Sequence, residues 1–308
     1  MKARQLSPLD RVLLFSRIAP SDFQDNVRRL AEVSRERVVR DGEVLLREDE
    51  AANVVWVAVD AIIQRTRNGH TFPPFDPPSP VGLIEALAGR TPGTELKVLT
   101  GGLVLEVPVE HMLDMLMSGR RGLVSLLGRL GAAVVATVGL LPRPPKNPVE
   151  IGDDATVSLL DRLILLSSGD LVGRVGLDTM APVARQMTER RYVAGETLWT
   201  AGDVTQSGIL VARGRVTCTQ QDGKSAEALP PTTLGFLDHL VLHKMSFTAV
   251  AKTDVVTLSL PVQAMVENME THDDLALAVI QGMASAVVEL PILIQAKNSI
   301  FEEITSRV

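Results

Sequence analysis

Two histidines four residues apart, His239 and His243, have the spacing that most directly suggests chemistry. On a helix both imidazoles would lie on one face, where they could bind a metal ion with Asp238 as a further ligand. No third histidine is nearby, and the positions 153 residues earlier hold Ala86 and Arg90. We therefore expect no metal site, and a metal-dependent enzyme is the least favoured alternative.

Motifs for other catalytic chemistry are missing. The sequence has no glycine-rich phosphate loop with a lysine, no Gly-x-Ser-x-Gly elbow and no paired carboxylates at a recognisable catalytic spacing. We predict a non-enzymatic protein without catalytic residues.

The composition excludes some classes of binding partner and indicates the cellular compartment. The 308 residues carry a net charge of −6, and aromatic residues make up 3%. Nucleic-acid surfaces need clustered Lys and Arg or stacking aromatic side chains, so we expect no nucleic-acid partner. The single cysteine, Cys218, excludes an internal disulfide and fits a reducing compartment, which predicts a cytoplasmic protein. Abundant Leu, Val, Ala and Arg suggest a bacterial source.

The elements that must position any site recur along the chain at a constant offset of 153 residues. The segment 42–45 (Gly-Glu-Val-Leu) recurs at 195–198 (Gly-Glu-Thr-Leu). The single-residue matches are Gly82 with Gly235, Glu85 with Asp238, Thr100 with Thr253 and Pro108 with Pro261. A fixed period without insertions predicts one folded unit used twice.

Each copy is predicted to contain helices, then short strands, then closing helices. Apolar residues recur at spacings of three and four over 9–31 and 159–184, which indicates amphipathic helices. Short β-type runs with turn residues follow and indicate a small barrel or sandwich. The expected fold class is α+β: two tandem units, each a small β-barrel or jelly roll flanked by N- and C-terminal helices. A proline-rich linker at 142–150 is expected to join domains 1–141 and 151–308.

The closing helices at 111–141 and 262–306 are strongly apolar, and 122–141 carries only one charge, Arg129. A charge at mid-bilayer costs about 2.5–3.5 kcal/mol, and the second copy carries Gln281 and Glu289 in the matching segment. We expect no membrane insertion. Helices this apolar should bury against each other, the sheets or a second chain, and a homodimer through them is the expected assembly.

The order of these features resembles the cyclic nucleotide-binding domain of catabolite-activator-type regulators, kinase regulatory subunits and gated channels. The resemblance rests on the N-terminal helices, the Gly-Glu-x-Leu segment, a strand ending near 213–216, a Gly turn with a short helix, and a final strand and helix. It covers nearly the whole chain in two copies. The second copy matches better, because Asp49-Glu50 in the first replaces Gly202-Asp203.

The resemblance implies a phosphate-binding cassette. In the family a Gly begins a short helix whose amides face the cyclic phosphate, a Glu directly after it binds the ribose, and an Arg ten residues on pairs with the phosphate. In the second copy Gly235 is present, but Phe236 stands at the Glu position and Met245 at the Arg position. Ser246 and Thr248 follow, Thr248 where the family often has a small hydroxyl residue.

The first copy departs further from the cassette. Gly82 is present, but Leu83 replaces the Glu, Pro92 the Arg and Glu95 the hydroxyl residue, and a carboxylate there would repel a phosphate. Glu85 and Asp238 lie two places beyond the usual Glu. They either face a polar group or cap a helix turn, and we favour the structural role.

These substitutions predict weak nucleotide binding. A hydrogen bond to a charged group contributes about 1.5–3 kcal/mol, so losing the charged and ribose contacts should cost several orders of magnitude in affinity. We expect a regulatory or scaffolding protein that acts by protein–protein interaction, without a cofactor. The alternative is a signalling receptor for a cyclic mono- or dinucleotide. In such a receptor, Arg213, Arg215, His243 or Lys244 would supply the positive charge that the second cassette has lost.

Overall fold

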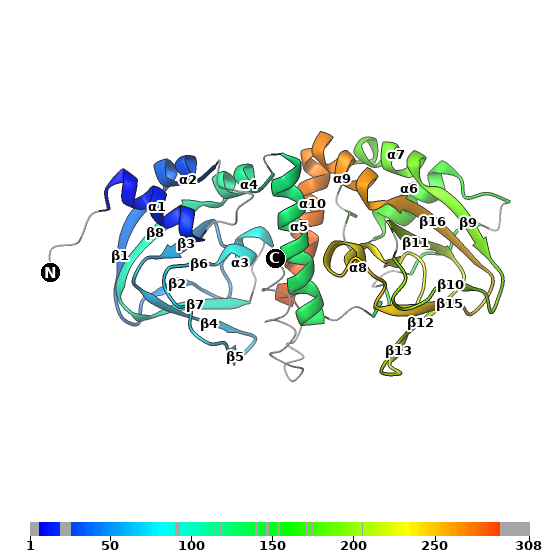
Figure 1. Cartoon of the computed structure of the whole chain (residues 1–308), viewed down its shortest axis with the longest axis horizontal. Helices are drawn as coiled ribbons and strands as arrows, with labels where there is room; N and C mark the ends of the chain where they lie inside the picture. The colour runs from blue at the N-terminus through cyan, green and yellow to red at the C-terminus, as the bar shows by residue number, and fades with distance from the viewer. Residues whose placement is uncertain are drawn as a thin grey trace. The chain divides into compact units, whose positions relative to one another are not determined.

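The computed structural model describes residues 6–18, 26–89, 93–117, 119–138, 141–145, 148–152, 155–169, 172–173, 175–204 and 206–289 (Figure 1). The chain divides into two compact units. Unit 1 comprises residues 1–126 and 283–296, and unit 2 comprises residues 127–282 and 297–308.

Unit 1 begins with two helices whose apolar faces, including Phe15, Val27 and Leu30, are buried. Its elements are α1 (Pro8–Ile18), α2 (Val27–Val33), β1 (Arg35–Val39), β2 (Val44–Leu46), β3 (Val54–Ala58), β4 (Ile62–Arg67), β5 (His70–Thr71), β6 (Ser79–Val81), α3 (Leu83–Leu87), β7 (Thr94–Thr100), β8 (Gly102–Pro108), α4 (Val109–Met117) and the start of α5 (Arg120–Val138). The end of α10 (Asp273–Glu289) completes it.

Unit 2 repeats this order. Its further elements are α6 (Leu159–Ser167), α7 (Leu177–Gln186), β9 (Thr188–Tyr192), β10 (Thr197–Trp199), β11 (Ser207–Arg213), β12 (Val216–Gln220), β13 (Ser225–Ala228), β14 (Thr233–Leu234), α8 (Phe236–Val241), β15 (Phe247–Ala251), β16 (Val255–Pro261) and α9 (Val262–Thr271). Ser158 caps α6, because its side chain accepts a hydrogen bond from the Asp161 amide.

Within the described ranges, the strands of each unit form two four-stranded antiparallel sheets. Their orders are β1-β8-β3-β6 and β2-β7-β4-β5 in unit 1, and β9-β16-β11-β14 and β10-β15-β12-β13 in unit 2. One apolar cluster in unit 2 takes Val211 from the first sheet and Val216, Cys218 and Phe247 from the second, so the core lies between the sheets. The predicted α+β fold is confirmed, but the sheets are not closed into barrels.

The 153-residue period holds in the strand registers and not only in the sequence. The equivalent pairs are Arg35↔Glu106 with Thr188↔Ser259, Val44↔Lys97 with Thr197↔Val250, and Trp56↔Val81 with Ile209↔Leu234. A slip of one residue would turn every side chain to the other face of its sheet, so equal registers mean that equivalent positions face the interior of each unit. The predicted duplication of one folded unit is confirmed.

The hairpins β4–β5 and β12–β13 differ locally. Asn68 and Gly69 both have positive φ angles, 48° and 75°, as a two-residue turn requires. The turn in unit 2 includes Gly223, with a φ of 84°, and the amide of Gln220 donates to the carbonyl of Lys224. This difference leaves the register of the next strand, β6 or β14, unchanged.

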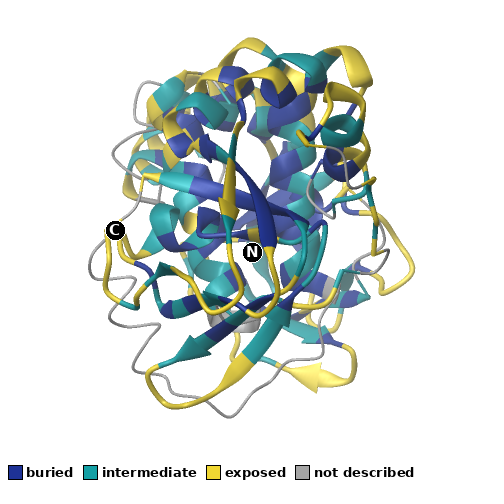
Figure 2. Ribbon diagram, turned by 90° about the vertical axis from the view of Figure 1, so that its right-hand side faces the viewer, coloured by how far each residue is buried: buried dark blue, intermediate teal, exposed yellow. Residues whose placement is uncertain are grey.

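Several apolar side chains of the closing helices are buried within the single chain. Leu123 and Leu126 of α5 are 2% and 3% exposed, and Leu275 and Val279 of α10 are 0% and 1% exposed. Figure 2 colours the ribbon by burial and shows buried, half-buried and exposed residues side by side along the helices and strands. No helix in the described ranges is both long and apolar enough to span a bilayer. The predicted continuation of the last helix beyond 289 falls outside the described residues.

Candidate functional site

Gly82 and Gly235 directly precede the short helices α3 and α8. Both glycines adopt the left-handed backbone conformation, with φ angles of 83° and 78°. Residues that carry a Cβ rarely adopt this conformation. The first helical hydrogen bonds run from the Ala86 and His239 amides back to the two glycine carbonyls. Each unit therefore builds the same strand–glycine–helix turn at the equivalent position.

Side chains of the protein lie close against both turns. A Cβ on Gly235 would lie 2.7 Å from the Met245 methyl carbon, and Met245 is 3% exposed. A Cβ on Gly82 would lie 3.1 Å from the Trp56 ring. Met245, at the family's Arg position, thus occupies the space beside Gly235.

The space between the sheets of unit 2 is filled by apolar side chains. Phe247 is 1% exposed, and its ring centroid lies 5.7 Å from that of Trp199. The Trp199 indole nitrogen donates to the Phe247 carbonyl at 2.9 Å. Cys218 is fully buried, and burial together with the nearby Asp238 charge raises its pKa to about 12, which keeps the thiol protonated.

Asp238 is buried in the same unit and forms hydrogen bonds that connect α8 to the turn after it. Its Oδ1 accepts from the Ser246 amide at 2.8 Å, and its carbonyl accepts from the Leu242 and His243 amides at 2.9 Å. No cation in the described ranges pairs with its carboxylate, and burial raises its pKa. These contacts are those of a structural residue.

Thr248 and Glu95 lie on strand faces that point away from the core. Residues alternate along a strand. In β15 the buried positions are Phe247, Ala249 and Ala251, and in β7 they include Thr94 and Leu96 on either side of Glu95. The Thr248 hydroxyl accepts from the Ala201 amide at 3.1 Å. The expectation that Glu95 would repel an anion inside unit 1 therefore has no geometric basis.

Unit 1 contains a charged cluster that sequence reasoning missed. Glu85 is 2% exposed and forms an ion pair with Nη2 of Arg67, which is 3% exposed. Arg67 also donates from Nε to the Thr94 hydroxyl at 2.8 Å and from Nη1 to the Val287 carbonyl at 3.1 Å. Arg65 lies 3.7 Å from Glu85 Oε1. The available signal was two arginines at inward alternate positions after Ile63.

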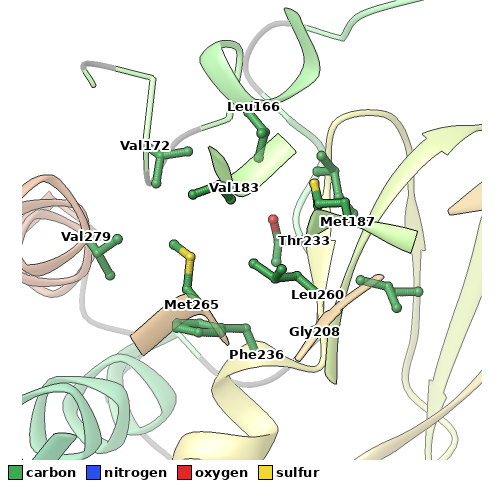
Figure 3. Close-up of a pocket in the computed structure, with 12 residues that line it drawn as sticks. Leu166, Val172, Val183, Met187, Gly208, Thr233, Phe236, Leu260, Met265 and Val279 are labelled. Atoms are coloured by element: carbon green, nitrogen blue, oxygen red, sulfur yellow. The ribbon is translucent and has the colours of Figure 1, made fainter. Parts of the chain in front are cut away.

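Leu83 and Phe236 occupy the first helical positions after the glycines, and Pro92 lies outside the described residues. Phe236 does not enter the space between the sheets. It lines a cavity of ≈80 Å³ in unit 2 between the β11–β16 sheet and the helices (Figure 3). Leu166, Met265 and Val279 also line this cavity, so its wall is largely apolar.

The two histidines that suggested a metal site have ring centroids 6.0 Å apart at an interplanar angle of 84°. Across the described residues, no group of three His, Cys, Asp or Glu side chains is placed to hold a metal ion. Asp238, the candidate for a further ligand, accepts from the Ser246 amide.

Residues 189–272 match the family model of the cyclic nucleotide-binding domain. No curated protein matches the chain. Among solved structures, it is similar to the regulatory subunit of a cAMP-independent protein kinase A from Trypanosoma brucei, at 13% identity over 87% of this chain and 90% of that chain, with a TM-score of 0.35.

Two other solved structures each match a stretch of this chain that is shorter than one unit. The N-terminal domain of a transcriptional regulator from Streptomyces coelicolor A3(2) is 20% identical, covers 39% of this chain and 89% of its own, and has a TM-score of 0.35. The catabolite activator protein of Thermus thermophilus is 23% identical, covers 36% and 55%, and has a TM-score of 0.32. The match to the cyclic nucleotide-binding domain model thus lies in unit 2, and unit 1 repeats the strand order and register of that segment.

Proposed function

We propose that this chain is a non-enzymatic regulatory protein that uses the cyclic nucleotide-binding fold as an interaction scaffold and does not bind cyclic AMP in the usual way. In this proposal both units hold their folded arrangement through internal contacts, and signals pass by contact with other proteins. The proposal keeps the domain boundaries expected from the sequence, which are 1–141 and 151–308 with a linker at 142–150.

The filled space between the sheets of unit 2 is the observation that carries the proposal. Small-molecule sites typically enclose about 300–1,000 Å³. Here Phe247, Cys218 and Met245 are 1%, 0% and 3% exposed. A nucleotide would have to displace them, and re-exposing one large apolar side chain costs about 1.5–3 kcal/mol.

Charge supports the same conclusion at the cassette of unit 2. Met245 and Phe236 supply no ionic or hydrogen-bonding group where the family has Arg and Glu. Among the described residues of unit 2, the buried charged side chain is Asp238, which is acidic and would repel a phosphate. Both the shape and the charge of this interior therefore oppose an anionic ligand.

Exposed apolar side chains on the N-terminal helices of each unit offer a contact surface. Leu9 and Leu13 of α1 are 67% and 55% exposed, and Leu160 and Ile164 of α6 are 67% and 39% exposed. The closing helices are already buried within one chain, so a homodimer through them would need them uncovered. We therefore place the protein contact on the faces of α1 and α6.

Calorimetry with cyclic AMP, cyclic GMP and cyclic dinucleotides tests the ligand half of this proposal. We expect no saturable heat with the native chain. A variant with Phe236→Glu and Met245→Arg restores the family's residue types, and it should still fail because Phe247 keeps the space filled. Micromolar binding by the native chain that is lost in Gly235→Trp would overturn the proposal and establish a receptor.

Sedimentation tests the contact half. If the exposed leucines mediate self-association, the native chain should form a concentration-dependent dimer, and Leu160→Asp with Ile164→Asp should shift it to monomer. Val204→Asp is a matched control, because Val204 is 73% exposed and lies outside both helices. Equal weakening by the control would remove α6 from the contact.

A further inference from the structure

We propose that unit 1 carries a binding site for a compact oxyanion, a phosphate or carboxylate group, at the guanidinium of Arg65 beside Phe72 and Phe75. The site lies on the β4–β5 hairpin and the segment that follows it. It goes beyond the scaffold function, because it does not require a cyclic nucleotide and its test has a separate outcome.

The charge balance of the cluster points to a missing anion. Glu85 is paired with Arg67, whose donors also reach the Thr94 hydroxyl and the Val287 carbonyl. That network is closed and neutral. Arg65 is a second guanidinium beside the same carboxylate, so the cluster holds one more positive charge than negative.

Arg65 has donors to spare. The contact of its Nη1 with Glu85 Oε1 is long, at 3.7 Å. Its Nε is buried and has no hydrogen-bond acceptor in the described parts of the chain, so the terminal Nη groups are the donors that an oxyanion would meet. Burial lowers the pKa of Arg65, Glu85 raises it and Arg67 lowers it, but a guanidinium remains charged at neutral pH. A partly buried cation with unfilled donors is stabilised by an oxyanion, which can accept two parallel hydrogen bonds.

The aromatic rings hold the guanidinium in an orientation suited to such a ligand. The Arg65 Cζ lies 4.2 Å from the Phe72 ring centroid and 5.5 Å from that of Phe75. A guanidinium held over a ring face keeps its edge N–H groups free in its own plane. Backbone hydrogen bonds hold the main chain at both phenylalanines: the Phe72 amide donates to the Arg65 carbonyl at 2.9 Å, and the Phe75 amide to the Ile63 carbonyl at 2.8 Å.

The site is open to solvent and specific to unit 1. The Arg65 side chain is 20% exposed, whereas that of Arg67 is 3% exposed, so only Arg65 can be reached by a ligand. In unit 2 the equivalents of Arg65 and Phe75 are Cys218 and Ala228, both fully buried. The fold therefore does not require this arrangement, and unit 2 acts as an internal comparison without it.

Calorimetry of the full chain with inorganic phosphate and with acetate, in a buffer without other oxyanions, tests the site. The native chain should bind one phosphate saturably. Arg65→Gln should weaken binding about 10- to 150-fold, the range of one charged hydrogen-bond contact. Arg47→Gln is the control, since Arg47 is a 67% exposed arginine of unit 1, and it should leave binding unchanged.

Two results would overturn the site: no saturable heat with either anion, or equal weakening by Arg65→Gln and Arg47→Gln. Arg65→Lys guards against a folding artefact, because it keeps the charge but loses the fork and should bind between the native chain and Arg65→Gln. If phosphate binds and cyclic AMP does not, both proposals stand. Cyclic AMP binding that depends on Arg65 would leave the oxyanion site standing and overturn the scaffold proposal.

Discussion

Units 1 and 2 place an acidic side chain at the same buried position and surround it in opposite ways. Glu85 lies between two arginines, whereas Asp238 accepts only a backbone amide and has no cationic partner in the described part of unit 2. The difference comes from β4 and β12, where Arg65 and Arg67 have Cys218 and Gln220 as equivalents. One fold thus tolerates a charged interior and an apolar one.

This contrast shows what the acidic residue contributes in each unit. In unit 2 it joins α8 to the following turn through Ser246. In unit 1 Glu85 balances the charge of a buried guanidinium. Removing one partner of a buried ion pair costs more free energy than the intact pair contributes to stability, because the other charge is left buried alone. The acidic residue therefore makes a local backbone hydrogen bond in unit 2 and neutralises a buried arginine in unit 1.

The largest effect is expected from Phe247→Ala, which empties the apolar interior of unit 2. Phe247 is 1% exposed, and truncating a buried Phe costs about 3–5 kcal/mol. Urea unfolding followed by Trp199 fluorescence, in a Trp56→Phe background, reports unit 2 alone. Thr94→Ala, at the equivalent place in unit 1, should cost less in the Trp199→Phe background, and a reversed order would contradict the filled interior.

Next comes Glu85→Gln, which leaves Arg67 buried without its counter-charge. We expect unit 1 to lose about 2–4 kcal/mol, somewhat below the loss for deleting a buried partner because the amide oxygen still accepts a hydrogen bond. The matched change Asp238→Asn should cost unit 2 less than about 1 kcal/mol or stabilise it, since no cation is left alone. Equal losses in the two units would refute the contrast.

The pH dependence of unit 2 gives a smaller effect with a definite sign. Burial raises the pKa of Asp238 in the folded state, so the folded chain binds this proton more tightly than the unfolded chain. Unit 2 should lose stability as the pH rises from the ordinary aspartate pKa, about 3.9, through the raised pKa of the folded state. The loss is about 1.4 kcal/mol for each tenfold difference in proton affinity between the two states. Unfolding followed by Trp199 fluorescence in the Trp56→Phe background should show this slope, and adding Asp238→Asn should flatten it.

The smallest difference separates the two glycines. Alanine at either position must adopt a positive φ, which costs about 1 kcal/mol. Gly82→Ala should cost more than Gly235→Ala, because it meets the rigid Trp56 ring at 3.1 Å, whereas Gly235→Ala meets the flexible end of Met245 at 2.7 Å. Thermal unfolding of the two variants measures the order.

The duplicated fold could be predicted from sequence because a 153-residue period is insensitive to exact strand ends. Gly82 and Gly235 could be found as turn residues for the same reason. The orientation of Glu95 and Thr248 could not, because a shift of one residue reverses a strand's faces and no local pattern fixed the start of β7 or β15. The pairing of Arg67 with Glu85 also escaped prediction, since a long-range contact leaves no mark on sequence spacing.

The bond from Arg67 to the Val287 carbonyl spans 220 residues of chain. During synthesis at about 5–20 residues per second, the strand that carries Arg67 leaves the ribosome roughly 10 to 40 s before α10 does. Throughout that time the buried Arg67 lacks this acceptor. This hydrogen bond of unit 1 can therefore form only after most of unit 2 has been made.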